Sequence, residues 1–485
     1  MKKGIAAFLG LFLALSLYLA AAVPDREFTL SPYAKYADGG AIANSGGTPL
    51  QGDSSSSESA VIKRPWIAAL ETFSINIGVW AVDRYILNRD YARIGWTAWK
   101  NNFKNGWIWC PDTFGTSMIG HPYHGSQTFN AARSLGMNFW ESVPYSLAGY
   151  VMWGYFMEND QPSKNDLFMT GLSGASLGEV EYRLSSQVLD DTATGGERAW
   201  REILAFVINP IRGFNRLIYG DATRVSSTNR VTHEPLQGTA SVGGSLISGT
   251  GGFSGIKFSP GVDYDLTYGV GSSEIYSQKP FDLFFLNGEV RYGQKQVFFS
   301  VSTYGLLWGK ELGSSVRCKS VIGLFQNYDY FNSETIHVGS MSFSGGLVSL
   351  FPLGGDFELT TSVQLGFVPL GGVKNPYVLV KDRDYSYDWG GMGKAEAWLR
   401  HPKIGTLAIR IGRFQLYSIN GAAPTEGDEG HDYWTYIKAD YTLPLAKNLG
   451  LSVGYGWYDL HQEFNGHPPV VAKLSRVGAS LDMTF

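Results

Sequence analysis

Two histidines and several carboxylates give this 485-residue chain its clearest potential for chemistry. The histidines lie three positions apart in the segment His121-Pro122-Tyr123-His124-Gly125. An imidazole can transfer protons near neutral pH or bind a metal, and a carboxylate can act as its base or as another ligand. The candidate catalytic residues are therefore His121, His124, Glu141 and Asp166, with Glu158 and Glu179 as further carboxylates.

The sequence leaves the role of these residues open. A sulfur-free set of histidines and carboxylates suits Zn²⁺ or another divalent ion. The spacing H-x-x-H is a weak signal, because it lacks the glutamate of H-E-x-x-H and because Pro122 disfavours a mid-helix position for His121. A Ser/His/Asp hydrolase using Ser163 or Ser173 also stays open. We favour a structural role, in which the polar residues pair in buried turns with Arg133, Arg183, Arg198 and Arg212.

These residues belong to a region, 64–220, whose apolar pattern predicts an α-helical domain. Helices are expected over 66–87, 136–156, 172–189 and 197–208. Glu71, Asp83 and Glu141 interrupt the apolar runs with charge. We therefore interpret these segments as core helices of a periplasmic domain rather than as membrane spans.

The rest of the chain, 236–485, alternates apolar and polar residues, as strands of a membrane barrel do. In the last segment Val477, Ala479, Leu481, Met483 and Phe485 share one face. About twelve such runs are predicted, an even number as in bacterial barrels. Their approximate starts are Leu236, Gly255, Phe281, Lys295, Val316, Ile336, Phe357, Gly391, Thr406, Asp432, Leu449 and Ala472. The predicted fold class is an α+β membrane protein, with a helical domain followed by an antiparallel transmembrane β-barrel of about 12 strands.

Connection lengths predict how the barrel is oriented. Long connections at 371–389, 419–431 and 463–470 alternate with short ones at 352–356, 401–405 and 444–448. Bacterial barrels keep short turns in the periplasm and long loops outside. Twelve strands return the start of the first strand to the periplasm, so we expect the helical domain there.

The N-terminus predicts export. A basic start, an apolar run over 5–19 and Ala20-Ala21-Ala22 are typical of a signal peptide, 1–22. A Gly/Ser-rich linker, 23–63, follows it, and a second linker, 221–235, precedes the barrel. With the terminal aromatic Phe485, these features predict the cell outer membrane, with its lipid and the barrel assembly machinery as partners. The aromatic-rich composition, with 27 Tyr, 28 Phe and 14 Trp, suits aromatic girdles at the membrane interfaces.

Other composition features exclude some classes of site. The net charge of −4 provides no basic footprint for nucleic acid. The two cysteines, Cys110 and Cys318, lie far apart, so neither a disulfide nor a cysteine metal site is predicted. The sequence indicates no particular metal, cofactor or oligomeric state.

Two motifs resemble a known family. They are the H-P-Y-H-G segment beginning at His121 and the segment Asn209-Pro210-Ile211-Arg212-Gly213-Phe214-Asn215-Arg216. The region 86–220 is similar to the bacterial family catalogued as domain of unknown function 3943, found at the front of outer-membrane proteins. The resemblance implies a placement and an architecture, and no particular reaction.

Three function hypotheses follow. The first is an outer-membrane barrel with a periplasmic helical domain, acting in envelope maintenance or solute passage. The second is an envelope lipid- or glycan-modifying enzyme that uses His121 or His124 with a carboxylate. The third is a structural plug or docking module. Convergence of His121, His124, Glu141, Glu158 and Asp166 in one pocket would favour the second.

Overall fold

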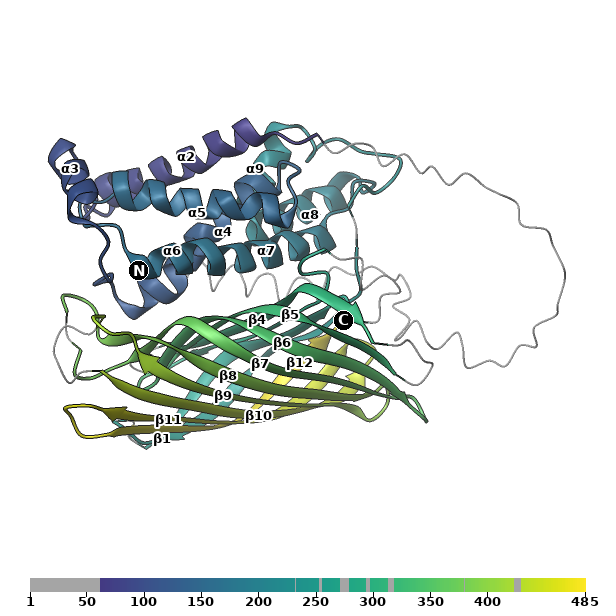
Figure 1. Ribbon diagram of the computed structural model, residues 1–485. Coiled ribbons are helices and arrows are strands. Elements are labelled where there is room, and N and C mark those ends of the chain that lie inside the picture. Colours follow the sequence, from purple (N-terminus) through teal and green to yellow (C-terminus); the bar gives the residue numbers. More distant parts are fainter. Residues whose placement is uncertain are drawn as a thin grey trace.

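The chain folds into a set of helices followed by a closed twelve-stranded antiparallel barrel (Figure 1). The computed structural model describes residues 62–231, 233–252, 255–270, 279–293, 297–312, 318–378, 380–422 and 429–485. The predicted signal peptide and nearly all of the first linker lie outside these residues. The predicted fold class, a helical part followed by a twelve-stranded barrel, is confirmed.

The helices form a unit that we call the helical layer. Its α-helices are α2 (Pro65–Ala81), α3 (Trp96–Asn105), α4 (His121–Arg133), α5 (Phe139–Phe156), α6 (Lys164–Phe168), α7 (Gly174–Val188), α8 (Gly195–Ile208) and α9 (Pro210–Ile218). Three π-helical segments extend them: η2 (Val82–Ile86), η3 (Thr116–Gly120) and η4 (Met169–Ser173). The sequence predicted α2, α5, α7 and α8 and missed α4, because η3 runs directly into it and helical backbone continues through His121 and Pro122.

The barrel strands lie close to their predicted positions. They are β1 (Leu236–Gly249), β2 (Ile256–Tyr268), β3 (Phe284–Tyr292), β4 (Val297–Glu311), β5 (Lys319–Asn332), β6 (His337–Leu353), β7 (Phe357–Lys374), β8 (Tyr385–His401), β9 (Gly405–Ser418), β10 (Gly430–Ala446), β11 (Leu449–Phe464) and β12 (Val470–Thr484). β1 pairs with β12, from Thr239 opposite Thr484 to Gly249 opposite Leu474, and this pairing closes the barrel. Only β8, predicted from Gly391, begins more than three residues from its predicted start.

Side chains from opposite walls meet inside the barrel. The Lys394 ammonium of β8 lies 2.7 Å from the Asp329 carboxylate of β5, and Arg410 of β9 pairs with Asp265 of β2. Glu289 of β3 contacts cations of β10 and β12, each at 3.4 Å. Two cavities in the lumen hold about 30 and 80 Å³, which is room for a few waters at most. Among the described residues, polar and aromatic side chains therefore fill much of the lumen.

The helical layer packs on the outer wall of the barrel, beside it rather than inside it (Figure 1). Successive side chains of a strand point to opposite faces. Asp329 of β5 faces the lumen, so Gln326 and Tyr328, which lie three residues and one residue before it, face outward. The Gln326 amide donates to a carbonyl of η4 at 2.7 Å, and the Tyr328 hydroxyl donates to a carbonyl of η3 at 2.5 Å. Contact with the helical layer also explains why β8 begins earlier than predicted, since its first residue, Tyr385, is buried against Phe114 of that layer.

The helical layer reaches both ends of the barrel. We call the end with the connections 354–356, 402–404 and 447–448 the turn end, and the end with 375–384, 419–429 and 465–469 the loop end. The β2–β3 connection lies at the turn end, and there Asp282 pairs with Arg183 of α7 at 2.8 Å. The β7–β8 connection lies at the loop end, and there Lys381 pairs with Asp160, just after α5, at 3.0 Å. The helical layer therefore extends along the full height of the barrel wall.

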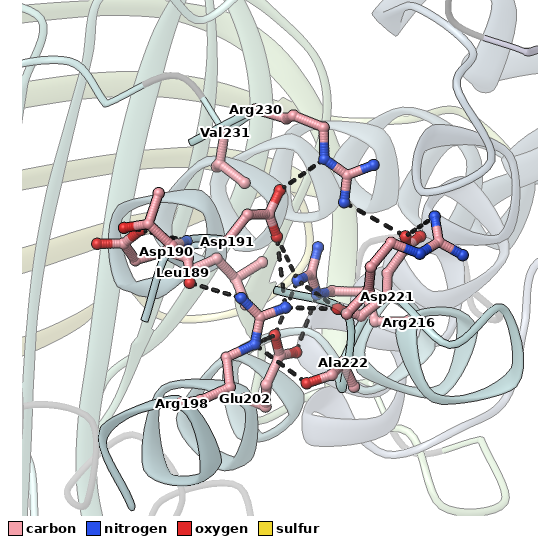
Figure 2. A network of polar contacts seen from close by, with 12 residues as sticks. Leu189, Asp190, Asp191, Arg198, Glu202, Arg216, Asp221, Ala222, Arg230 and Val231 are labelled. Atoms are coloured by element: carbon pink, nitrogen blue, oxygen red, sulfur yellow. Dashed lines mark hydrogen bonds and ion pairs between the residues drawn. The ribbon is translucent and has the colours of Figure 1, made fainter. Parts of the chain in front are cut away.

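An ion-pair network anchors the helical layer to the chain that leads into β1 (Figure 2). The buried Asp191 carboxylate, just after α7, accepts from Arg216 of α9 at 2.9 Å and from Arg230 of the linker at 3.0 Å. Glu202 of α8 pairs with Arg198 at 2.9 Å and with Arg216 at 2.8 Å. One carboxylate thus connects α7, α9 and the linker, and a second one adds α8.

Two glycines let α4 and the η4–α7 segment approach closely. A Cβ placed on Gly125 would lie 1.8 Å from the Thr170 carbonyl oxygen, and one placed on Gly174 would lie 2.6 Å from the Gly125 Cα. Backbones that touch in this way are typical of helices that pack through small residues.

We expect Gly125→Ala to lower the free energy of unfolding by about 1–3 kcal/mol, because the two backbones must move apart to admit the methyl group. The measurement is denaturant unfolding of the full chain in detergent micelles. The control is Gly78→Ala in α2, where a Cβ meets nothing within 4 Å. Equal stability of the two variants would contradict the close packing.

Candidate functional site

A cluster of His121, Cys110, Asp112 and Asp166 forms at the loop end of the helical layer. His121 is the first residue of α4, and Asp166 lies in α6. Cys110 and Asp112 lie in the segment between α3 and η3. The Cys110 sulfur, a His121 ring nitrogen and an Asp166 carboxylate oxygen all lie within 4.8 Å of one another. Three separate segments therefore bring a thiol, an imidazole and carboxylates to one place.

The distances around His121 fit ligands of a shared cation better than hydrogen bonds. His121 Nε2 lies 3.4 Å from an oxygen of Asp166 and 3.5 Å from an oxygen of Asp112. It is buried and makes no hydrogen bond to a described residue. Bonds of about 2.0–2.3 Å to a tetrahedral Zn²⁺ separate the ligand atoms by about 3.3–3.8 Å. The two separations between His121 Nε2 and the aspartate oxygens lie in that range.

The cluster carries an excess of negative charge. Burial, and next the charges of Asp166 and Asp112, raise the pKa of the Cys110 thiol well above its usual value. Burial, followed by the same two aspartates, also raises the pKa of the nearby Glu158 carboxyl well above its usual range. Although burial by itself raises the pKa of Asp112, its interactions with the neighbouring His121 bring that pKa below its usual value. A cation would relieve this repulsion and favour the thiolate.

Neighbouring residues fix the cluster in place. The Asn165 side chain donates to Asp166 at 2.6 Å and accepts from the Cys110 backbone N–H at 2.9 Å. The Tyr387 hydroxyl of β8 donates to the Cys110 carbonyl at 3.0 Å. The side chain of Asp112 is 40% exposed, whereas that of Asp166 is 3% exposed. The cluster is therefore held rigidly on one side and open to its surroundings at Asp112.

The other predicted residues do not join this cluster. His124 Nε2 lies 2.8 Å from Asn76 Oδ1 of α2, and its ring meets Trp153 edge to face. Glu141 caps α5 at the turn end in a capping box with Asn138 and pairs with Lys63 at 2.7 Å. Both residues have structural partners, so only His121 and Asp166 of the four candidate catalytic residues converge.

Glu179 also has a structural place. Its buried carboxylate lies 2.7 Å from Arg133 of α4 and 2.8 Å from Arg183 of α7. Two of the arginines predicted as partners of buried polar groups thus pair with the same carboxylate. A third, Arg212, donates to the hydroxyls of Ser185 and Ser186 at 2.8 and 2.6 Å.

Cys110 and Asp112 are not among the residues predicted from the sequence. Cys110 was considered there only together with Cys318, and neither cysteine forms a disulfide in the structure. The set considered from the sequence contained no sulfur, whereas the structure places the Cys110 thiol beside His121 and Asp166. The available signal was the short segment Cys110-Pro111-Asp112, two ligand types one residue apart shortly before His121.

Part of the helical layer matches a known protein family. Residues 106–211 match the family described as Domain of unknown function (DUF3943). The matched segment contains Cys110, Asp112, His121 and Asp166, and it ends within α9. No curated protein matches the chain.

Several solved outer-membrane structures are similar to the barrel part. A NanC porin is 10% identical, with a TM-score of 0.26 over 50% of this chain and 98% of its own. The Pseudomonas putida toluene transporter TodX is 8% identical, with a TM-score of 0.23 over 52% and 89%. An anion-selective porin from Comamonas acidovorans is 7% identical, with a TM-score of 0.22 over 52% and 99%. At TM-scores this low, these similarities provide no evidence about the fold beyond the barrel that the structure itself contains.

Proposed function

We propose that the chain is an outer-membrane protein of envelope maintenance, in which the barrel is an anchor and the helical layer binds a zinc ion. The observation that supports it most is the buried His121 Nε2 without a hydrogen bond, 3.4–3.5 Å from two carboxylates and near the Cys110 thiol. Cysteine, histidine and aspartate are all ligands that Zn²⁺ accepts in tetrahedral sites.

The barrel supports the anchoring role. Exposed apolar residues such as Leu365, Ile411, Leu451 and Val453 alternate on its outer face with inward polar residues, as in membrane barrels. Among the described residues, ion pairs cross the lumen, and the two cavities found there are small. These features favour an anchor over solute passage, which stays the competing hypothesis for the barrel.

The site also favours one version of the enzyme hypothesis. Cys110, His121 and Asp166 are buried, whereas Asp112 is partly exposed and could leave a coordination position to a substrate. An ion held by three protein ligands can act as a Lewis acid on an ester or phosphoryl oxygen. A lipid- or glycan-modifying reaction would therefore use Cys110, His121 and Asp166, and not His124.

Metal binding tests this proposal. We expect the purified full chain to bind one Zn²⁺ ion, and His121→Ala to weaken the affinity by roughly 100-fold or more, since even neighbours of a ligand contribute 10–100-fold. Chelator competition gives the affinity. The melting temperature gives a second readout, because zinc at 100 times its Kd stabilises the folded state by about 2.7 kcal/mol.

The matched control is His461→Ala. His461 is another histidine beside a carboxylate, 3.3 Å from Glu463, but it lies on β11 of the barrel and its side chain is partly exposed. Its replacement should leave the zinc affinity and the zinc-induced stabilisation unchanged. Equal zinc binding by wild-type protein and by the Cys110→Ala and His121→Ala variants would overturn the proposed site.

A further inference from the structure

The helical layer is apolar on the side that faces away from the barrel. α2 and η2 together cover Pro65–Ile86, which is long and apolar enough to cross a membrane. The exposed apolar residues of this stretch are Trp66, Leu70, Phe73, Ile77, Val79, Val82, Tyr85 and Ile86. Its buried residues in α2 are Ala68, Thr72 and Asn76, which are small or polar. The prediction of a buried core helix here is therefore wrong.

Buried charged and polar groups lie inside the helical layer, beside apolar core residues such as Phe129, Met169 and Leu184. Glu179 is fully buried between two arginines, and Glu181 of α7 accepts from the Ser126 hydroxyl at 3.0 Å and from the Asn130 amide at 3.2 Å, both of α4. Glycines bring α4 and α7 into backbone contact. Helices in lipid show this distribution, with polar pairs and small residues inside and apolar residues outside. A surface helix of a domain in water keeps its outward face polar instead.

Four helical segments run between the two ends of the barrel. α2 begins at the turn end, where the Arg64 N–H donates to the Leu135 carbonyl just after α4. η3–α4 runs from the loop end to the turn end, and α5 runs from the turn end to the loop end. α6–η4–α7 then runs from the loop end to Arg183 at the turn end. At 1.5 Å per residue these segments are about 27–37 Å long, against about 30 Å for the hydrocarbon core of a bilayer.

Exposed aromatic residues mark both ends of this layer. Trp66 and Trp140 lie at the starts of α2 and α5, at the turn end, and are exposed. Tyr85 and Trp96 lie at the other end of α2–η2 and at the start of α3, and are also exposed. Tryptophan and tyrosine concentrate where a membrane meets water. Between the two aromatic levels, the exposed residues of α2 and η2 are apolar apart from Ser74, whose hydroxyl donates to the Leu70 carbonyl.

We propose that the helical layer lies in the membrane beside the barrel, with bilayer acyl chains covering the outward face of α2 and α5. The layer reaches both ends of the wall it packs on, so a bilayer that surrounds the barrel meets the layer as well. This inference rests on the proposed outer-membrane placement of the barrel, and it replaces the expected periplasmic position of the helices.

The composition of the segments is compatible with export. Within the described residues, only Pro65–Ile86 is a helix apolar enough by itself to cross a membrane. The other crossing segments contain the inward-facing polar residues of α4 and α7, such as Asn130, Glu179 and Glu181. Each of these segments by itself is therefore a poor stop-transfer signal in the inner membrane. The segments form an apolar outer surface only after they pack together and against the barrel wall.

Spin labels on the full chain in phospholipid nanodiscs test the proposal. In a Cys318→Ser background, where the remaining Cys110 is buried, a label is attached at Phe73→Cys in the middle of α2. The measurement compares relaxation by oxygen, which concentrates in lipid, with relaxation by a water-soluble nickel chelate. We expect the oxygen-to-nickel ratio at Phe73 to exceed by several-fold the ratio at Gly354→Cys in the β6–β7 turn.

Val453→Cys, on the exposed outer face of β11, is the lipid reference. If the label at position 73 has an oxygen-to-nickel ratio like that at position 354, while the label at position 453 has the high ratio of a lipid-facing site, the proposed lipid contact of α2 is overturned and the placement of the barrel is not. Low accessibility of Phe73 to both reagents would show a protein neighbour, such as a second copy, and would overturn it too. A water-like Val453 would instead refute the proposed placement of the barrel. If Phe73→Cys fails to fold, Leu70→Cys gives the same comparison.

Discussion

Replacing Glu179 by alanine is expected to lower the free energy of unfolding of the helical layer by about 3–5 kcal/mol, because it removes the carboxylate of a buried ion pair. Glu179 is fully buried and pairs with Arg133 at 2.7 Å and with Arg183 at 2.8 Å. Arg183 keeps a second carboxylate, Asp282, at 2.8 Å. Among the described residues, Arg133 keeps a backbone carbonyl at 3.1 Å and the face of Tyr182, and no carboxylate. The unpaired guanidinium of Arg133 therefore accounts for most of the loss.

The control for this variant is Glu141→Ala. Glu141 is also a carboxylate of the helical layer that pairs with a cation, but its side chain is 40% exposed. We expect a much smaller loss there, from the capping box at the start of α5 and a weak surface pair. Both variants are measured by denaturant unfolding in the same detergent. Equal losses would mean that the Glu179 carboxylate is not stabilised by its arginines.

The barrel could be predicted almost strand by strand, because a strand between lipid and a polar lumen must alternate with period two. The runs beginning at Phe357 and Leu449 start at the predicted residues. The error at β8 shows the limit of this rule. Tyr385 and Tyr387 follow four consecutive charged residues, 381–384, and resemble a loop in sequence. They are strand residues whose outward rings are covered by Trp109 and Phe114 of the helical layer.

The helical layer could be predicted only in part. α2 was found from its apolar run, but its environment was misjudged, because Glu71 and Asp83 suggested a soluble core helix. The structure explains Glu71, whose carboxylate accepts from Asn215 of α9 at 2.9 Å. One inward-facing charge with a partner is compatible with a helix whose other faces contact lipid. Composition alone does not tell which face of the helix a charge occupies.

The candidate site depended on packing that spacing does not reveal. His121 and Asp166 lie on α4 and α6, and the contact between them follows from how the α5 and α6–α7 segments fold back along α4. Glu141 could have been excluded from the sequence, since Asn138 and Glu141 have the N-x-x-E spacing of a capping box. For Cys110 the segment Cys110-Pro111-Asp112 is a local signal, but its contact with His121 of α4 and Asp166 of α6 follows only from the fold.

Inside the barrel, Lys394→Ala is expected to lower the free energy of unfolding by about 3–5 kcal/mol, because it leaves the buried carboxylate of Asp329 without its cation. Both side chains are almost fully buried, and their shortest N–O distance is 2.7 Å. Lys473→Ala is the control, since this lysine of β12 is half-exposed and lies 3.9 Å from Asp459. We expect a change of at most about 1 kcal/mol for the control.

The double variant Lys394→Met/Asp329→Leu separates two contributions to the free energy of unfolding. One is the net stabilisation by the ion pair, and the other is the destabilisation from leaving one buried charge unpaired. Apolar side chains of similar length leave no charge in the lumen, and such replacements of buried pairs are often neutral or stabilising. We therefore expect the double variant to recover most of the stability that Lys394→Ala loses, in folding assays in lipid vesicles. An equally unstable double variant would mean that the ion pair itself stabilises the barrel. Recovery would mean that the lumen requires filling more than it requires this charge pair, as expected for a barrel that serves as an anchor.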